Sequence, residues 1–518
     1  MRCLIASLIV FIIITSQDNN WFYNSRDDNE CTIAVIGGSA TVDGRPILWK
    51  NRDVRNADQK YLYIPGCYTE QETTFAYIGN FYADDSTRCF MGINECGFAV
   101  VNANCYNLPD SLNNEGLDDG DIMHWALQRC RDITDWEMFL DLTNELGRED
   151  PWIFGVIDSY GGAVLYECGN FSWIKYDTKI PANAPDGVIV RTTFALSGND
   201  DVEGIERYKR ACHLFYNRPA FRPIDIKYFL QTIIRDFACD MCNPYPLPYY
   251  GQMGDLPVGF IDALYTINRY KTRSCSLIRG VLEDENPKLA TTFAILGQPA
   301  LSIAIPLWVA SGEVPIYLNG EQHAPWYDII SERMKLLYPL KEHPTCMNTL
   351  YLLDSTGAGV YSYTLPLEDW GVRQAEQNLR SWRNQIVNPG IIRSAQMGIC
   401  EALWQGFVNE SDSIIRAFEV KEAAFEYRLS NYPNPFNVST TIYLDLNDRD
   451  NINTVSVNIY NILGQKVAGL GEVDLYNGYA SVTWNGCDDS GMLLASGVYF
   501  YCIENPRIRK TGKMILLR

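Results

Sequence analysis

The stretch Cys31-Thr-Ile-Ala-Val-Ile36 is followed, after Thr41-Val-Asp-Gly44, by Arg45-Pro-Ile-Leu-Trp-Lys50. Both runs are rich in β-branched and apolar residues and a glycine-containing turn separates them, so they predict a β-hairpin. The hairpin would bring Lys50-Asn-Arg-Asp53 back beside the start of the first strand. A cysteine that begins a strand opposite polar residues is unusual as a packing residue. The pattern therefore predicts a chemical role for Cys31.

That role becomes clear if the chain is cut between Glu30 and Cys31, which would make Cys31 an N-terminal residue. A free α-amino group titrates near pH 8 and can accept the thiol proton. Nucleophile and base then reside on one residue, so no catalytic histidine is needed. The chain has 16 cysteines and only four histidines, which fits this arrangement. The polar, acidic residues 18–30 are typical of a removable propeptide, and the chain is predicted to be a zymogen.

Several blocks carry a resemblance to a known family. The residues Cys31-Thr32, Ala40-Thr-Val-Asp-Gly44 and Trp49-Lys-Asn-Arg-Asp53 resemble the N-terminal-nucleophile (Ntn) autoproteolytic acyltransferase/hydrolase family. This family includes penicillin V acylase, bile salt hydrolase and acyl-coenzyme A:6-aminopenicillanate acyltransferase. Further blocks at 92–104, 187–192, 206–210 and 272–276 follow in the family's order. The resemblance covers residues 31 to about 306 and implies an α+β fold, a four-layer αββα sandwich.

The resemblance also implies roles for individual residues. Cys31 falls on the nucleophile, Asp53 on the carboxylate that binds the new α-amine, and Asn104 on an oxyanion donor. Thr193 stands where the relatives carry a second oxyanion donor, an asparagine. Arg207 falls on the arginine that organises the site, although Arg210 could take that place.

The remaining polar residues of the hairpin, Lys50, Asn51 and Arg52, are predicted to bind substrate. Lys50 replaces the arginine of bile salt hydrolases, so it keeps the charge but loses the planar fork. The resemblance requires neither a metal nor an organic cofactor. A net charge of -20 disfavours a nucleic-acid partner and an anionic membrane surface. Oligomeric state is not predicted.

The C-terminal residues 425–518 have a different texture, with short alternating runs at Thr440–Leu446, 455–460, 480–484 and 497–502 that predict a small Ig-like β-sandwich. The blocks 431–437, 460–466, 484–486, 495–501 and 513–517 resemble the sorting domain of type IX secretion. This resemblance implies a secreted or cell-surface protein, exported through the periplasm, with the secretion machinery as partner. An ordinary adhesive module is the alternative.

The rest of the chain divides by composition. Residues 1–17 read as a signal peptide, since their apolar run is shorter than the ~20 residues that span a bilayer. Residues 31–367 are assigned to the catalytic domain, with strands expected at 350–353 and 360–364, and residues 368–424 to a helical extension. The cysteines either form disulfides or are buried as small apolar residues.

The sequence thus predicts a secreted hydrolase or acyltransferase that cleaves a linear amide (C–N, non-peptide) or related acyl bond of a small molecule through a Cys31 thioester. A dipeptidase-like cysteine peptidase of the same fold is one alternative. A catalytically weak surface binding protein is the other.

Overall fold

The structure is a computed structural model that describes residues 29–55, 58–69, 72–111, 115–200, 203–217, 223–320, 323–383, 385–424, 427–446, 454–475, 479–505 and 509–518. The predicted signal peptide and all but the last two residues of the predicted propeptide lie outside these ranges.

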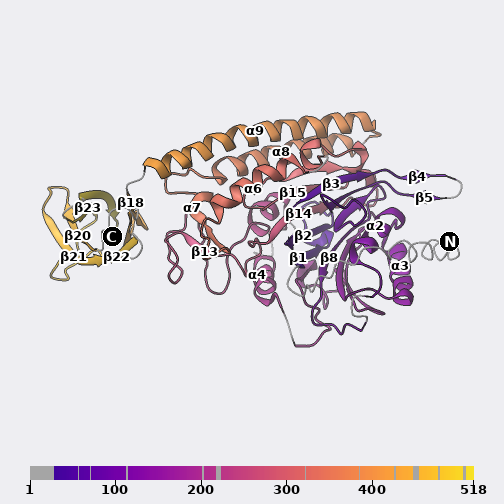
Figure 1. Ribbon diagram of the computed structural model, residues 1–518, viewed down its shortest axis with the longest axis horizontal. Coiled ribbons are helices and arrows are strands. Elements are labelled where there is room, and N and C mark those ends of the chain that lie inside the picture. Colours follow the sequence, from indigo (N-terminus) through magenta and orange to yellow (C-terminus); the bar gives the residue numbers. More distant parts are fainter. Residues whose placement is uncertain are drawn as a thin grey trace.

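Two antiparallel sheets form the centre of the molecule (Figure 1). The six-stranded sheet runs in the order β12 (Val188–Arg191), β1 (Asn29–Ile36), β2 (Ile47–Val54), β14 (Thr272–Arg279), β15 (Thr291–Leu296), β16 (Ile305–Trp308). The seven-stranded sheet runs β11 (Trp173–Asp177), β10 (Ala163–Cys168), β9 (Trp152–Ile157), β8 (Ala99–Asn104), β7 (Met91–Asn94), β6 (Tyr77–Tyr82), β3 (Gln59–Ile64). The sheets face one another, since a Cβ added to Gly155 of β9 would meet Val35 of β1 and Leu48 of β2.

Helices cover the outer face of each sheet. On the seven-stranded sheet, α2 (Asp119–Arg129) and α3 (Ile133–Leu146) bury an apolar cluster that includes Trp136 and Phe154. The six-stranded sheet is covered by α4 (Ile205–Tyr216), a π-helical turn (Phe229–Ile233), α6 (Pro325–Leu337), α8 (Tyr361–Trp382) and α9 (Pro389–Ala424). The predicted four-layer αββα sandwich is therefore confirmed.

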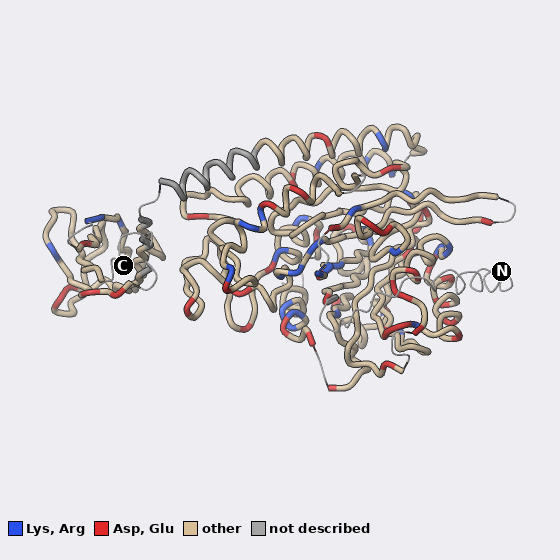
Figure 2. Tube along the Cα trace, viewed as in Figure 1, with Lys and Arg blue, Asp and Glu red and all other residues tan. Residues whose placement is uncertain are grey.

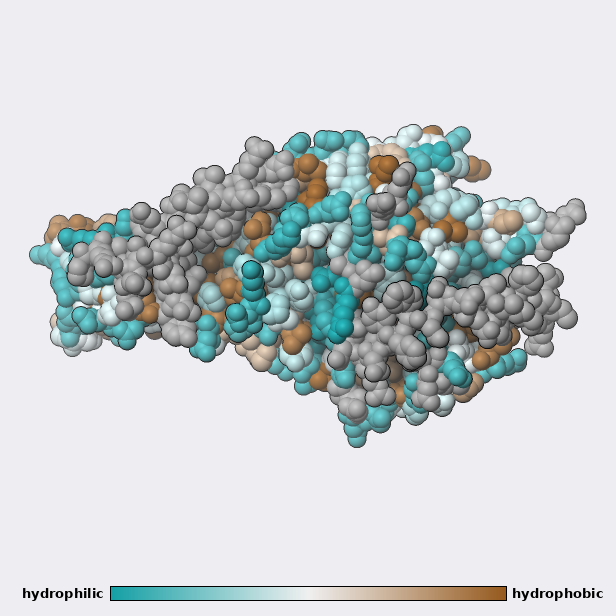
Figure 3. Space-filling model, viewed as in Figure 1, coloured by the Kyte–Doolittle hydropathy of each residue, from teal (hydrophilic) through white to brown (hydrophobic). Residues whose placement is uncertain are grey.

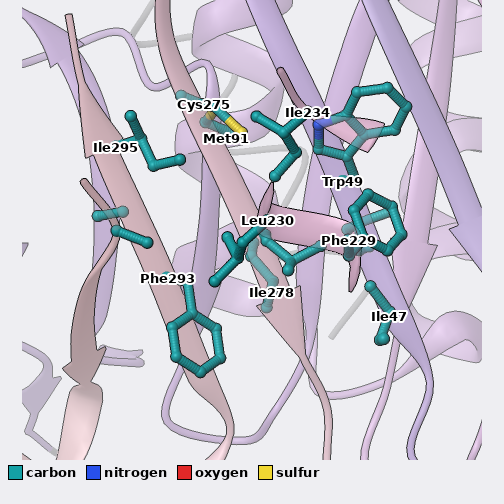
Figure 4. Close-up of a cluster of buried hydrophobic side chains, with 14 of the residues drawn as sticks. Ile47, Trp49, Met91, Phe229, Leu230, Ile234, Cys275, Ile278, Phe293 and Ile295 are labelled. Atoms are coloured by element: carbon teal, nitrogen blue, oxygen red, sulfur yellow. The ribbon is translucent and has the colours of Figure 1, made fainter. Parts of the chain in front are cut away.

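Aromatic contacts tie these helices to the six-stranded sheet. The ring of Trp49 on β2 lies 5.4 Å from that of Phe229 and 6.4 Å from that of Phe215 on α4, as centroid distances. Figure 4 shows Trp49 beside Phe229 in this buried cluster. Farther along the sheet, Trp308 of β16 packs edge-on against Trp382 of α8 at 5.2 Å.

Two of the expected strands are helical instead. Residues 350–353 fall in α7 (Thr349–Leu352) and its end, and residues 360–364 open α8, so both expectations are wrong. Their short apolar runs bury Leu352 and Tyr363 against the neighbouring layers, and such runs do not distinguish a buried strand from a buried helix. Helix α8 begins at Tyr361, within the range 31–367 assigned to the catalytic domain.

An ion pair between Arg235, which follows the π-helical turn, and Glu368 of α8 offers a test of this packing. The buried Arg235 guanidinium donates to Glu368 Oε1 at 3.0 Å and to Oε2 at 2.7 Å. Replacing Glu368 by alanine would leave a buried charge unpaired, so we expect a loss of about 3–5 kcal/mol in the free energy of unfolding. Denaturant titration measures it. The exposed Glu332–Lys335 pair is the control, and Glu332→Ala should change that free energy by less than about 0.5 kcal/mol.

The C-terminal segment forms a sandwich of two sheets, drawn in yellow in Figure 1. Three strands, β18 (Tyr427–Tyr432), β19 (Thr440–Leu446) and β22 (Tyr479–Trp484), pack on four, β21 (Lys466–Asp474), β20 (Thr454–Asn461), β23 (Gly497–Glu504) and β24 (Arg509–Leu516). Phe436, Ile459, Trp484 and Leu516 belong to its core. All four strands predicted here are confirmed.

The described cysteines are all free thiols, most of them buried, which favours the packing alternative over disulfides. Cys239 and Cys242 exchange two backbone hydrogen bonds, of 2.8 and 3.2 Å, so this CxxC is a tight turn. Within the described ranges no helix is long and apolar enough to cross a bilayer, and no group of three His, Cys, Asp or Glu residues could hold a metal. Figure 3 shows hydrophilic residues over much of the visible surface, with hydrophobic residues in small separate groups.

Candidate active site

The register of the β1–β2 hairpin decides which side chains share a face. Cys31 lies opposite Arg52, and Glu30 lies opposite Asp53. Because side chains alternate along a strand, Cys31 and Arg52 point between the two sheets, while Glu30 and Asp53 point toward α4. The hairpin expected from the sequence is thus confirmed.

The Cys31 thiol is buried, with 3% of the residue exposed. Burial raises its pKa, and the Asp53 charge adds to this effect, whereas Lys50 and Arg52 act in the opposite direction. A neutral thiol is therefore the favoured state in the uncut chain. Activating it requires a base that can reach the sulfur.

Residues of the seven-stranded sheet and its connections contact Lys50 and Arg52. Lys50 Nζ donates to Asn102 Oδ1 at 2.5 Å and to Phe90 O at 3.0 Å, and burial lowers its pKa. The Arg52 guanidinium lies 3.8 Å from the Phe90 ring centroid and 4.4 Å from that of Tyr82. Both cations are therefore fixed close to the thiol.

Asn51 has a different environment from its two neighbours. Its Nδ2 donates to Ile234 O at 3.0 Å and Ile267 O at 3.2 Å, and its Oδ1 accepts from Trp49 Nε1. The fully buried amide is committed to these partners, on the sheet face opposite Cys31. The structure therefore does not bring the Asn51 side chain to the thiol together with Lys50 and Arg52.

Asp53 is buried, and only one of its two carboxylate oxygens accepts a side-chain hydrogen bond. Its Oδ1 accepts from Thr272 Oγ1 at 2.6 Å, while Oδ2 has no hydrogen-bond partner and lies 4.0 Å from Arg269 Nη1. Burial raises the pKa of Asp53 to about 6, against the opposing charges of Arg269 and Arg207. The carboxylate can accept one more donor at a position beside the Glu30–Cys31 junction.

Two buried arginines hold the Glu30 side chain. Arg207 Nη1 and Arg269 Nη1 both donate to Glu30 Oε2. Burial alone would raise the pKa of Glu30, but the charges of Arg207 and Arg269 lower it to about 2. Figure 2 shows basic segments in α4 and in the central strands beside it.

This ion-pair cluster should make the uncut chain sensitive to acid. A carboxyl group whose folded-state pKa is lowered adds stability above its ordinary pKa and loses it as the pH falls toward the folded value. In a Cys31→Ala background we therefore expect the Glu30 contribution, about 2–3 kcal/mol, to disappear between pH 4.5 and about 2. Unfolding free energies at pH 7 and 2.5 measure it. Adding Glu30→Gln should remove that part of the pH dependence, and an unchanged pH profile would contradict the assignment.

Arg207 reaches Glu30 because the residue before α4 is a glycine. Gly204, with φ at +76°, precedes α4, and a Cβ there would lie 2.6 Å from Arg207 Nη2. Thr192 and Thr193 fix this turn through their hydroxyls, which donate to Gly204 O at 3.1 Å and Glu203 O at 2.9 Å. Arg210 instead pairs with Asp236 through two 2.7 Å hydrogen bonds, so it does not take the place of Arg207.

The two expected oxyanion donors differ. Asn104 ends β8 and is half-buried, whereas Thr193 is fully buried and gives its single hydroxyl proton to Glu203 O. In this arrangement Thr193 therefore offers no side-chain donor to an oxyanion, contrary to its expected role. Its backbone carbonyl accepts from Tyr106 N at 3.0 Å, which links the segment after β8 to the segment after β12.

Sequence reasoning missed three residues of this site. Arg269 and Thr272 reach Glu30 and Asp53 from the segment that enters β14, and the charges of Glu30 and Cys31 add to burial in raising the pKa of Tyr106. Thr272 belongs to a block that matched the family, but Arg269 and Tyr106 stand outside the matched positions. Their proximity is a product of topology, which no local pattern reports.

Comparison with known proteins identifies the C-terminal segment. Residues 430–517 match the family described as the secretion system C-terminal sorting domain. This segment is a type IX secretion sorting domain. The sorting domain indicates a secreted or cell-surface protein and implies an interaction with the secretion machinery.

Solved structures give likenesses for both parts of the chain. Dimeric latent PorU from Porphyromonas gingivalis is 24% identical over 18% of this chain, which spans 9% of PorU, with a TM-score of 0.16. A mutant of conjugated bile acid hydrolase from Clostridium perfringens is 14% identical, covering 54% of this chain and 92% of its own, with a TM-score of 0.33. Penicillin V acylase from Agrobacterium tumefaciens is 12% identical, covering 54% and 86%, with a TM-score of 0.32. No curated protein matches the chain.

Proposed function

We propose that the chain is the precursor of a secreted Ntn amidohydrolase or acyltransferase, with Cys31 as nucleophile after cleavage of the Glu30–Cys31 bond. One observation carries the proposal. Asp53 Oδ2 is buried without a hydrogen-bond partner, on the residue that pairs with Glu30 across the hairpin and follows Arg52, the partner of Cys31. A buried acceptor without a donor is costly. The α-amine released at Cys31 is a donor of the right charge at the right place.

Exposure of that amine needs no other enzyme. Cys31 Sγ attacks the carbonyl carbon of Glu30, a C–S bond forms, and the C–N bond breaks as the nitrogen takes the thiol proton. Water then hydrolyses the thioester and releases the segment that ends at Glu30. The same sulfur, now beside a free amine, is ready for an external acyl compound.

Turnover repeats this chemistry on a linear amide. The α-amine, oriented by Asp53, accepts the thiol proton and later returns it to the leaving amine, while Lys50 and Arg52 favour the thiolate. Asn104 and a backbone N–H stabilise the oxyanion, and such donors contribute about 3 kcal/mol each. The resulting thioester passes its acyl group to water or to another amine.

The most direct test is the N-terminal sequence and intact mass of the mature protein. A chain that begins at Cys31 supports the proposal. A mature chain that begins elsewhere, together with normal activity of Cys31→Ser, would rule it out. A substrate panel of N-acyl amino acids, penicillin V, conjugated bile acids and dipeptides then separates amidohydrolase from dipeptidase activity.

The engaged hydroxyl of Thr193 favours a second candidate, a catalytically weak surface binding protein. Thr193→Asn restores the residue expected from the family resemblance. If the second candidate is correct, the wild-type protein should show no Cys31-dependent turnover of any compound on the panel.

A further inference from the structure

The two arginines that hold Glu30 have more hydrogen-bonding capacity than the uncut chain uses. The Arg207 and Arg269 side chains are 1% and 3% exposed. Nonetheless, Arg207 Nε and Nη2 and Arg269 Nε lack hydrogen-bond partners. Buried guanidinium donors without acceptors are costly, so this site favours an anionic ligand with several acceptor atoms.

Cleavage would increase that demand. In the uncut chain the positive charges of Arg207 and Arg269 face the carboxylates of Glu30 and Asp53. When Glu30 leaves, two guanidinium groups and the new α-amine face Asp53 alone. The mature site thus has a buried excess of positive charge and an empty position that held a carboxylate.

We infer that, in the mature protein, Arg207 and Arg269 bind an anionic group on the acyl part of the substrate, a carboxylate separated from the scissile carbonyl by three carbons. This inference rests on the proposed function and specifies its substrate class. The spacing is that of Glu30 itself, whose side-chain carboxylate lies three carbons from its own carbonyl carbon. A glutaryl-type acyl group has the same length.

Two features support this assignment to the acyl side of the bond. The thioester formed during cleavage and the thioester of turnover join an acyl group to the same sulfur, so the acyl chain of the substrate follows the course of Glu30. The guanidinium is also the cation whose planar fork matches a carboxylate, and the glycine before α4 lets it approach.

The reaction leaves the anionic group unchanged. For a glutaryl amide, the C–S bond forms at the amide carbonyl, the C–N bond breaks, and the amine leaves with the proton held by the α-amine. Water then adds to the thioester, regenerates the thiol and releases a dicarboxylic acid, while the arginines keep the distal carboxylate throughout.

The test gives the mature full-length protein two chromogenic anilides, one glutaryl and one in which a carboxamide replaces the distal carboxylate. We expect kcat/KM for the glutaryl anilide to be about 30–100-fold higher, because a charge-assisted pair replaces a neutral contact. Arg269→Gln should bring this ratio close to one, and Arg269→Lys should give an intermediate value. Arg210→Gln removes a charge from α4 outside the site and should leave the ratio unchanged.

Protection of the thiol provides a readout that does not depend on turnover. Glutarate should slow alkylation of Cys31 by iodoacetamide more than glutaramide does, and Arg269→Gln should abolish the difference. Equal Cys31-dependent cleavage of both anilides would overturn the inference and leave the proposed function intact. Absence of cleavage with every compound, in a chain not processed at Cys31, would refute the proposed function and the inference together.

Discussion

Replacing Cys31 by alanine is expected to abolish both processing and turnover. In the proposed mechanism the thiol attacks the Glu30 carbonyl, so the variant should keep its N-terminal segment and retain the precursor mass. Loss of a covalent nucleophile lowers kcat by about 10⁴-fold or more, since only substrate binding and oxyanion stabilisation remain. Intact mass and hydrolysis of the best panel substrate measure the two effects.

Cys275 provides a matched control for this experiment. It is fully buried on β14, the strand beside β2. Its partner on β2 is Asn51, whereas the partner of Cys31 on β2 is Arg52. Cys275→Ala should be processed normally and should keep kcat within a few-fold of the parent. If Cys31→Ala matched the parent in mass and activity, Cys31 would not be the nucleophile.

Deleting residues 427–518 should abolish delivery to the cell surface. The sorting domain brings separated motifs together, since Phe436 N donates to Ile515 O at 2.9 Å and Leu517 N donates to Phe436 O at 2.7 Å. The deletion removes these motifs together with the rest of the sorting domain, so we expect the protein to accumulate in the periplasm. Fractionation and surface proteolysis measure its location.

A point variant tests whether export requires the sorting domain to be folded, and not only to be present in the chain. Trp484 is 1% exposed and packs against Phe436 and Tyr499, so Trp484→Ala should destabilise the sandwich by about 3–5 kcal/mol and reduce export. Thr441→Ala is the control, because Thr441 is only half-buried and its hydroxyl contacts Thr483 Oγ1 at 3.0 Å outside the core. Normal surface delivery of the truncated chain would refute the role of this domain.

The sequence predicted what local patterns can report. The hairpin that pairs Cys31 with Arg52 and the four strands of the sorting domain follow from alternation and turn residues. The strands expected at 350–353 and 360–364 failed because a short buried run has no period long enough to separate strand from helix. Tertiary packing on the six-stranded sheet decided those segments.

The candidate site was predictable only where local patterns place its residues. Asp53 follows from hairpin register, and Arg207 from a motif, but Arg269 is distant in sequence from Glu30 and meets it only because β14 lies beside β2. Thr193 shows a second limit. The residue type predicted a hydrogen-bond donor for the oxyanion. In the structure, however, the Thr193 hydroxyl already donates its hydrogen bond to Glu203 O.

The end of β12 has a consequence for maturation. β2 pairs with all of Asn29–Ile36, but β12 pairs only with Ile33–Ile36. Asn29 and Glu30, which the proposed cleavage would release, therefore pair in the sheet with β2 alone, and their departure would break no hydrogen bond of the β1–β12 ladder. The strands around Cys31 are already paired in this structure, so the proposed maturation would need only dissociation of a peptide, without rearrangement of the sheet.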